Sequence, residues 1–389
     1  MDSSDFFIVN YNSAEYDIKK FLRDHPGGVN TLLKYKGKNV MNAMEKFEHS
    51  ANAYHMMRDF RISTDFNDEN LAGSVSKNGR IITKEEVSRD QREIAFLEEL
   101  EAKIDWSKPI LEQLVKIAPH YNKWINSAVF RRCRLFRSSL LERLTYTPWY
   151  VVPLFWVPVI LYLGISQYFE YVACKGMLLV LILFHSEKRN FLQIINHIKG
   201  PTLSSTLVAW QGYLLNEITA KECSNQTILL IYYLYKIVLG LIIWSALEYT
   251  LHRWVFHLDP GSSLTMIKIH FLIHGLHHKT PFDGLRQVFP PVPAVLLAGL
   301  IYVPFQAVLS YPRIVLVGGL IGYLTYDMIH YYVHHGSPAA GTYLYAMKRY
   351  HSNHHFVNHD KAFGISNKFW DYVFKTVVQV KNLGFNLHW

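Results

Sequence analysis

Ten histidines in the last third of the chain stand at spacings that bring side chains together on helices. They form four groups: His252 and His257; His274, His277 and His278; His330 and His334; and His351, His354 and His355. Because residues at i, i+3 and i+4 share one face of an α-helix, each triplet is expected to aim three imidazoles the same way. The five-residue step from His252 to His257 predicts a helix end that turns into a loop. Imidazole suits zinc, iron, copper and nickel, and ten imidazoles are enough for two metal ions.

The alternative for any one of these groups is a structural role. A lone histidine on an apolar helix is more often a hydrogen-bonded core residue than a ligand. Four groups together favour metal binding, because ten imidazoles in or beside a membrane would otherwise leave many polar nitrogens in need of partners. The histidines that lack this spacing are expected to be structural, and they are His55, His120, His185, His197, His270, His335, His359 and His388.

A further pair of histidines lies near the N-terminus, where His25-Pro-Gly-Gly is followed by His49 twenty-four residues later. Pro-Gly-Gly alone fits a tight turn beside an ordinary surface histidine. With the second histidine in place, residues 6–62 resemble the cytochrome b5 family. The resemblance implies a small α+β domain that binds a b-type haem, with His25 and His49 as axial ligands. Two strong axial ligands leave no open position on the iron, so such a haem transfers electrons.

The apolar residues of the chain are concentrated after residue 147. Hydrophobic residues make up 50% of the sequence and aromatic residues 15%, which is too apolar for an ordinary soluble enzyme. Four apolar stretches, 148–169, 228–249, 292–311 and 314–326, predict two helical hairpins that cross a membrane four times. The stretch 172–184 is too short for a comfortable span, and we expect it to be re-entrant or interfacial.

Basic residues set the predicted orientation of these spans. Clusters of arginine beside a first span stay on the cytosolic side, and here they are Arg131, Arg132, Arg134, Arg137 and Arg143. With four passes, every histidine group then lies on the cytosolic side together with the N-terminal half. The segment 185–227, with a glycosylation sequon at Asn225, is expected on the opposite side.

Charge and cysteine content exclude some other classes of protein. The net charge of +9 comes from basic residues that flank the spans, so lipid headgroups rather than nucleic acid are their expected partners. The three cysteines, Cys133, Cys174 and Cys223, have no metal or redox spacing.

Residues 105–389 are similar to the fatty acid 2-hydroxylase branch of the membrane fatty acid hydroxylase and sterol desaturase superfamily. Some matching segments contain no histidine, which makes the resemblance specific. The matching segments are Asp105-Trp-Ser-Lys-Pro109, 248–257, 274–284, Phe289-Pro-Pro-Val-Pro293, 327–334, His351-Ser-Asn-His-His355 and Phe363-Gly-Ile-Ser366. A cytochrome b5-like domain ahead of this half is also the layout of that family, whereas the link 172–227 is longer than its usual one.

The resemblance implies that the ten histidines are the ligands of a dinuclear centre, with iron in the working enzyme and zinc as the alternative in isolated protein. It implies a monooxygenase of the endoplasmic reticulum membrane that hydroxylates C2 of fatty acyl chains for sphingolipid (ceramide) synthesis. Its partners would be a fatty acyl lipid, O2 and an NADH- or NADPH-linked reductase, with electrons relayed through its own haem. The carboxylates Glu248, Asp327 and Asp360 are candidates to orient imidazole N–H groups, or are ordinary interfacial residues.

Two other functions stay open at the level of the sequence. One is a related dinuclear-metal sterol or lipid desaturase or hydroxylase, and the other is a non-catalytic membrane haem electron donor with a structural metal site. Ten imidazoles exceed what a closed four-coordinate site needs, which favours an enzyme. The expected chain is mainly α. It has a cytochrome b5-like domain in 1–66, a linker with docking helices in 67–147, and in 148–389 a multi-pass membrane hydroxylase domain with a cytosolic histidine-rich helical cap.

Overall fold

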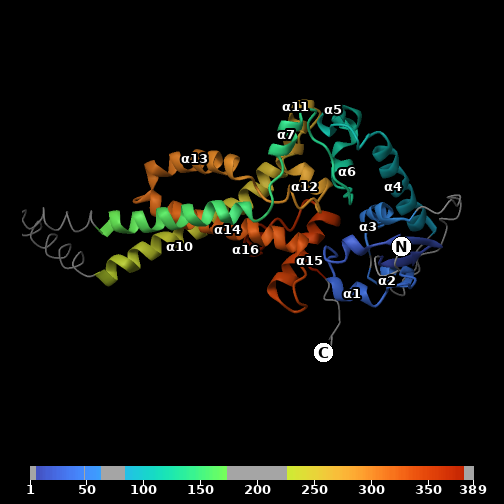
Figure 1. Ribbon diagram of the computed structural model, residues 1–389, viewed down its shortest axis with the longest axis horizontal. Coiled ribbons are helices and arrows are strands. Elements are labelled where there is room, and N and C mark those ends of the chain that lie inside the picture. Colours follow the sequence, from blue (N-terminus) through green and yellow to red (C-terminus); the bar gives the residue numbers. More distant parts are fainter. Residues whose placement is uncertain (1–5, 48, 63–83, 173–225, 381–389) are drawn as a thin grey trace, which may run out of the picture. The chain divides into compact units, whose positions relative to one another are not determined.

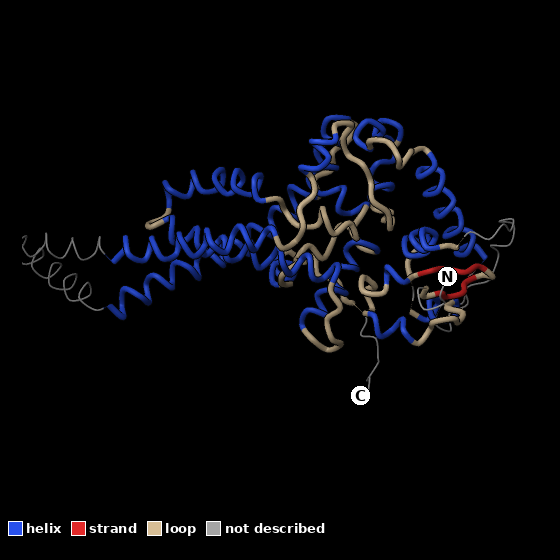
Figure 2. The backbone as a smooth tube through the Cα atoms, viewed as in Figure 1, coloured by secondary structure: helices blue, strands red, loops and turns tan. Residues whose placement is uncertain are grey.

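The structure, a computed structural model, describes residues 6–47, 49–62, 84–172 and 226–380. The predictions for 173–225, including the re-entrant segment and the sequon at Asn225, lie outside these residues. Contacts divide the chain into two units. One contains Met1–Val152, Ala246–Pro291 and Thr325–Trp389, and the other contains Pro153–Ser245 and Val292–Leu324. The described residues are mainly helical, and their strands lie in the N-terminal domain (Figure 2).

The N-terminal domain begins with an antiparallel hairpin. β1 (Ile8–Tyr11) pairs with β2 (Ala14–Asp17) so that Val9 lies opposite Tyr16. The two turn residues, Asn12 and Ser13, have φ of 45° and 61°. Positive φ at both positions of a two-residue turn matches the twist of the flanking strands.

Short helices complete this domain, which is the small α+β domain that the resemblance to cytochrome b5 implied. They are α1 (Val29–Leu33), α2 (Met41–Lys46) and α3 (Ala51–Met57), with 3-10 turns at Lys19–Phe21 and Arg58–Phe60. Phe7, Val9, Tyr16, Met56 and Phe60 form part of the buried core. This small domain therefore has a core of its own.

The same unit contains a cap of helices and turns from distant parts of the sequence. Its elements are α4 (Lys84–Ala102), α5 (Ile110–Gln113), η4 (Leu114–Lys116), η5 (Ala118–His120), α6 (Tyr121–Ile125), α7 (Ser139–Leu144), η6 (Leu251–Phe256), α11 (Leu264–His270), η7 (Phe271–Gly275), α12 (Leu276–Lys279), α15 (Tyr343–Phe356) and α16 (Phe369–Val373). Leu114, Ile117, Trp124 and Phe271 are fully buried in its core.

The charged helix α4 contacts the cap through an ion pair. Its Glu101 forms an ion pair with Lys279 at the end of α12, and the Lys279 ammonium also donates to the carbonyl oxygens of Trp124 and Ser127. A buried cation requires such partners. This contact ties α4 to the helix that carries His277 and His278.

Four helices are long and apolar enough to cross a membrane, as predicted. They span Val151–Val172, Thr227–Phe256, Pro291–Val308 and Pro312–His335, and include α10 (Gln226–Thr250), α13 (Pro291–Val308) and α14 (Pro312–His335). In the second unit α10 and α14 lie side by side (Figure 1), and a Cβ on Gly240 would meet the Val315 carbonyl oxygen. Small residues let membrane helices pack backbone to backbone.

Candidate functional site

All ten histidines singled out by their spacing lie in two groups of five. The first group is His252, His257, His274, His278 and His354, and the second is His277, His330, His334, His351 and His355. Within each group the candidate ligand nitrogens lie within 4.8 Å of one another. Eight of the ten side chains are buried and the other two are half-buried, so water has little access to either group.

The three imidazoles of each sequence triplet lie together, as predicted, but they are divided between the two groups. His274 and His278 belong to the first group, whereas His277 belongs to the second. In the same way, His351 and His355 join the second group and their neighbour His354 joins the first. Residues four apart stack on one side of a helix, whereas adjacent residues are turned by about 100°.

The step from His252 to His257 is bridged by a π-helix, and the predicted turn into a loop comes only after it. The π-helix η6 follows α10 directly, and the His257 N–H donates to the His252 carbonyl oxygen 3.1 Å away. A π-helix closes i to i+5 bonds, so residues five apart fall on the same side. A second π-helix, η7, carries His274. Such segments are frequent at functional sites.

In the first group the Nε2 atoms point at one another. The Nε2 atom of His274 lies 3.2 Å from that of His252, 3.2 Å from that of His257 and 3.1 Å from that of His278. Nitrogens bound to one metal ion at about 2 Å lie about 3 Å from each other. This spacing fits a metal ion at the centre of the group.

The second group has the same geometry. The Nε2 atom of His351 lies 3.1 Å from that of His330, 2.9 Å from that of His334 and 3.0 Å from that of His355. The buried side-chain amide nitrogen of Gln287 lies 3.2 Å from the Nε2 atom of His330. Sequence reasoning missed Gln287, because a single glutamine between two motifs carries no spacing signal.

Backbone carbonyl groups orient two of the imidazoles. The Nδ1 atom of His252 lies 2.5 Å from the Phe363 carbonyl oxygen, and that of His354 lies 2.7 Å from the Lys361 carbonyl oxygen. A carbonyl accepts only from N–H, so Nδ1 carries the proton and Nε2 presents its lone pair to the group. Several lone pairs at about 3 Å repel one another unless a cation lies between them.

The carboxylates proposed to orient imidazoles have other partners. Glu248 accepts hydrogen bonds from the backbone N–H and the hydroxyl group of Ser366, at 2.9 and 2.7 Å. Asp327 accepts from the backbone N–H of Phe289 at 3.2 Å, and Asp360 is exposed. Glu248 and Asp327 therefore hold the loops beside the site.

Burial keeps the imidazoles outside the spans in the neutral form that binds metals. It lowers the pKa of His277 to about 3. Burial, followed by repulsion from neighbouring imidazoles, sets the pKa well below its ordinary range at His257, His274, His278, His351, His354 and His355. Neutral imidazoles need no proton removed before they bind an ion.

Described histidines without the repeated spacing lie outside both groups. The Nδ1 atom of His270 shares a hydrogen bond of 2.8 Å with the Tyr121 hydroxyl group, and the Nδ1 atom of His335 lies 3.5 Å from a carboxylate oxygen of Asp24. His120 packs edge-on against Phe96. His55 and His359 also belong to neither group, and His185, His197 and His388 lie outside the described residues.

In the N-terminal domain, His25 and His49 face each other. Their ring centres are 6.2 Å apart and their planes differ by 24°. The Nδ1 atom of His49 lies 2.9 Å from the Met44 carbonyl oxygen, and that of His25 lies 3.3 Å from the Thr31 hydroxyl group, which leaves both Nε2 atoms for a ligand. Two imidazoles on one iron, with bonds of about 2 Å, have ring centres about 6 Å apart. The pair therefore fits the two faces of a haem.

The space around these two rings is a cavity of about 310 Å³. Its lining is mainly apolar and includes Phe21, Leu32, Tyr35, Val40, Met44 and Phe60. Burial lowers the pKa of His25 to about 3 and also lowers that of His49, so both rings are neutral. An apolar cavity with two neutral imidazoles suits a porphyrin.

The two glycines after Pro26 are each required for a different reason. A Cβ on Gly27 would lie 2.9 Å from the His25 ring, and Gly28 has φ of +82°, which side-chain-bearing residues rarely adopt. The motif is therefore required by the imidazole as well as by the turn.

Comparisons with known families match both halves. The profile described as fatty acid hydroxylase matches residues 237–376, and that described as cytochrome b5-like heme/steroid binding domain matches residues 3–65. The fold and the site thus define a membrane oxidoreductase of the fatty acid hydroxylase class with an attached cytochrome b5-like domain.

Individual relatives narrow this class. The chain is 34% identical to the fatty acid 2-hydroxylase of Homo sapiens over 96% of this chain and 91% of that protein. It is 28% identical to the ceramide very long chain fatty acid hydroxylase of Saccharomyces cerevisiae, over 96% of this chain and 91% of that protein. The chain also matches the solved structure of full-length scs7p, in which only the hydroxylase domain is visible. This match covers 71% of this chain and 86% of that chain, with a TM-score of 0.52 and 27% sequence identity. This chain belongs to the fatty acid 2-hydroxylase family and is a monooxygenase, which decides against a non-catalytic haem donor.

Proposed function

We propose that this chain hydroxylates C2 of fatty acyl chains that enter ceramide and related sphingolipids. By name, its relatives are fatty acid 2-hydroxylases in mammals and dihydroceramide fatty acyl 2-hydroxylases in Arabidopsis thaliana. One observation carries the proposal: in both five-imidazole groups, neighbouring Nε2 atoms lie 2.9 to 3.2 Å apart. We propose that all ten histidines are metal ligands, with iron in the working enzyme and zinc as the alternative in isolated protein.

The oxidant is O2, and the electrons come from an NADH- or NADPH-linked reductase through a haem held by His25 and His49. The reaction balances as one C–H bond, one O2, two electrons and two protons giving one C–OH group and one water. The support for an internal relay is that both histidine sites lie in the same compact unit.

When bound, a dinuclear metal centre supplies the oxidising power that an unactivated C–H bond requires. The residues of the chain prepare that site. The carbonyl groups of Phe363 and Lys361 fix the tautomers of His252 and His354, so that Nε2 faces inward. Burial of the imidazoles keeps water out, and the Gln287 amide stands beside the second group.

We place this membrane protein in the endoplasmic reticulum, with the haem site and both imidazole groups on the cytosolic side. Chain continuity supports placing the groups at the ends of spans, because α10 runs into η6 at His252, and α14 carries His330 and His334 in its last turns. The arginines at 131–143 ahead of the first span support the orientation.

The test is lipid mass spectrometry of cells that express the chain, a His351→Ala variant, or a His120→Ala control. The control removes an exposed imidazole outside both groups. We expect 2-hydroxy acyl chains in sphingolipids with the unmodified chain and the control, and background levels with His351→Ala. Equal 2-hydroxy acyl content in all three cultures would contradict the proposal. A hydroxylated or desaturated sterol in place of the 2-hydroxy acyl chains would support the alternative of a sterol-modifying enzyme.

A further inference from the structure

A cluster of phenylalanines joins the N-terminal domain to the cap. Phe130, Phe282 and Phe356 of the cap pack against the core that contains Phe21 and Phe60. The ring centres of Phe21 and Phe282 are 5.5 Å apart, those of Phe60 and Phe130 are 4.7 Å apart, and those of Phe130 and Phe282 are 5.5 Å apart. Aromatic rings at about 4.5–7 Å are in contact. Rings of the cap thus pack directly against the core of the N-terminal domain and extend it into one continuous aromatic cluster.

This cluster touches a haem-site histidine at one end and an imidazole of the second group at the other. The ring of Phe21 lies 5.8 Å from that of His25, and the ring of Phe282 lies 6.4 Å from that of His334. Only two rings therefore separate His25 from His334. A branch leads from Phe282 through Phe356, at 6.1 Å, to His355, at 6.3 Å. Phe282 lies on both branches.

We propose that electrons tunnel from the haem to the second imidazole group through the packed rings of Phe21 and Phe282. The proposal rests on the proposed function and names its internal route. Electron tunnelling falls off exponentially with distance, and it falls off faster across gaps than through packed atoms. Protein interiors are close-packed, so a continuous series of rings in contact is a favourable path. With haem held by His25 and His49 and metal held by the second group, each transfer would oxidise ferrous haem by one electron and reduce the metal pair by one. Two transfers, one O2 and two protons complete one hydroxylation, and the second oxygen atom leaves as water.

Helix α15 lies between the haem cavity and the imidazole groups, so the distance between the two sites is about the diameter of one helix. Part of the haem cavity is lined by Arg349, Ser352, Asn353 and Phe356 of α15. At 100° per residue these positions centre on one face, and His351, His354 and His355 centre on the opposite face. One α-helix with its side chains is about 10 Å across.

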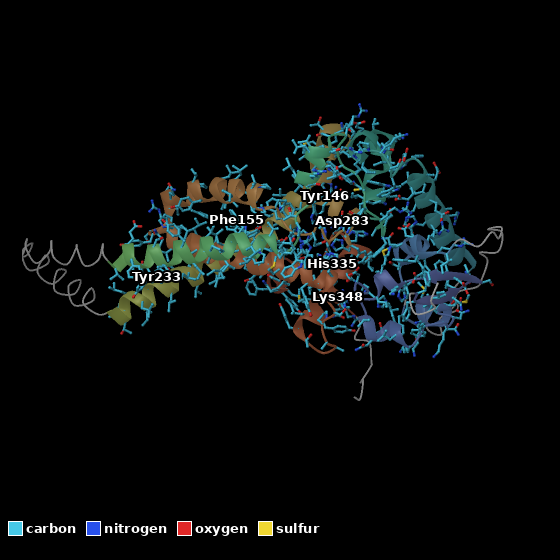
Figure 3. All side chains as sticks on the ribbon, viewed as in Figure 1. Tyr146, Phe155, Tyr233, Asp283, His335 and Lys348 are labelled. Carbon is cyan, nitrogen blue, oxygen red and sulfur yellow. The ribbon has the colours of Figure 1, made fainter. Side chains whose placement is uncertain are left out.

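Polar contacts also join the N-terminal domain to the cap. Asp59 of the N-terminal domain accepts a hydrogen bond from the Phe130 backbone N–H at 2.8 Å. Lys348 of α15 (Figure 3) is buried, and its ammonium donates to the Arg23 carbonyl oxygen at 3.4 Å and to the His334 carbonyl oxygen at 3.1 Å. Lys348 therefore links the segment before His25 to the backbone of a second-group histidine.

The test follows haem oxidation directly. Full-length protein loaded with haem and iron is reduced, mixed with O2 and a fatty acyl lipid in a stopped-flow instrument, and monitored through the haem absorption band. Metal-free protein measures the background reaction of haem with O2. The variants are Phe282→Leu, which removes the shared ring, and Phe282→Tyr, which keeps a ring. Phe130→Leu is the matched control, because it removes a ring of the same cluster that lies off the route.

We expect Phe282→Leu to slow haem oxidation by roughly tenfold, and Phe282→Tyr and Phe130→Leu to stay within about twofold of the unmodified chain. Haem content, haem midpoint potential and metal content should be equal in all four proteins. An unchanged rate in Phe282→Leu at equal potential would overturn the proposal. If Phe282→Leu fails to fold, Phe21→Leu interrupts the route at its other ring and is judged by the same rate. Absence of 2-hydroxy product with a rate that still depends on Phe282 would refute the proposed function and leave the route standing.

Discussion

The haem site and the imidazole groups are built in opposite ways. His25 and His49 come from one small domain with its own core, and a single motif with one further histidine locates them. The ten imidazoles come from η6, η7, α12, α14 and α15 and their ends, between residues 252 and 355. The two histidines of the first site are close in the sequence, although α15 also lines part of its cavity, whereas the ten ligands of the second come together only when distant segments pack correctly.

The difference extends to electrostatics. The haem site brings two neutral imidazoles together, whereas each metal group brings five. Folding of the metal-free cap must bury five converging nitrogens in each group, and a bound cation removes their repulsion. The imidazole groups should therefore depend on their ions more than the N-terminal domain depends on its haem.

The sharpest way to break this comparison is to remove one imidazole from the first group. His354→Ala should lower product formation by at least about 100-fold, because a metal ligand is lost, and should lower bound metal from two ions towards one. Haem content should not change. Metal analysis by mass spectrometry and haem absorbance measure the two sites separately. His359→Ala, a neighbour outside both groups, is the control, and full metal retention in His354→Ala would contradict the ligand assignment.

Removing a haem ligand should leave the other site intact. We expect His49→Ala to lose haem and to lower product formation by about tenfold or more, since electrons no longer reach the cap, while both metal ions stay bound. The same two measurements test this expectation. Loss of metal from His49→Ala would show that the two sites fold as one.

Acid should separate the two regions in metal-free protein. The folded pKa of His277 is about 3, and burial lowers those of six further cap histidines, against about 6.5 in the unfolded chain. Between these values the unfolded state binds protons that the folded state does not, so stability is fully present above about pH 6.5 and falls as the pH drops towards 3. We expect the melting temperature of the cap to fall by roughly 5 °C or more from pH 7.5 to pH 5. The same temperature at both pH values would show that the cap histidines titrate normally.

The smallest effect should come from loosening the contact between the two regions. Asp59→Ala leaves the Phe130 N–H without its acceptor and should weaken docking by about 1–3 kcal/mol. Hydrogen exchange of amides in residues 6–62 should then rise while haem content stays constant. Asp59→Asn keeps an acceptor oxygen and should exchange more slowly than Asp59→Ala. Exchange in Asp59→Ala as slow as in the unmodified chain would mean that Asp59 does not hold the domain.

The spacing of histidines predicted which ten would gather, and the apolar stretches predicted the four candidate spans. Spacing did not predict how the ten divide, because the assignment of His277 and His278 to different groups depends on how α12 is turned in the folded protein. The π-helix at His252 could not be predicted either, since nothing in its sequence, Leu-His-Arg-Trp-Val-Phe, distinguishes it from an α-helix. For Glu248 and Asp327 the sequence left two roles open, to orient imidazoles or to be ordinary interfacial residues. Carbonyl groups of Phe363 and Lys361 orient two imidazoles instead, and the sequence could not point to them because every residue has a carbonyl group.

Helix α15 donates one imidazole to the first group and two to the second, and the η7–α12 segment also supplies both. An ion that enters one group therefore stiffens the backbone that presents nitrogens to the other. Loading of the two ions should be cooperative, with the second bound more tightly than the first, and protein carrying a single ion should be scarce at half saturation.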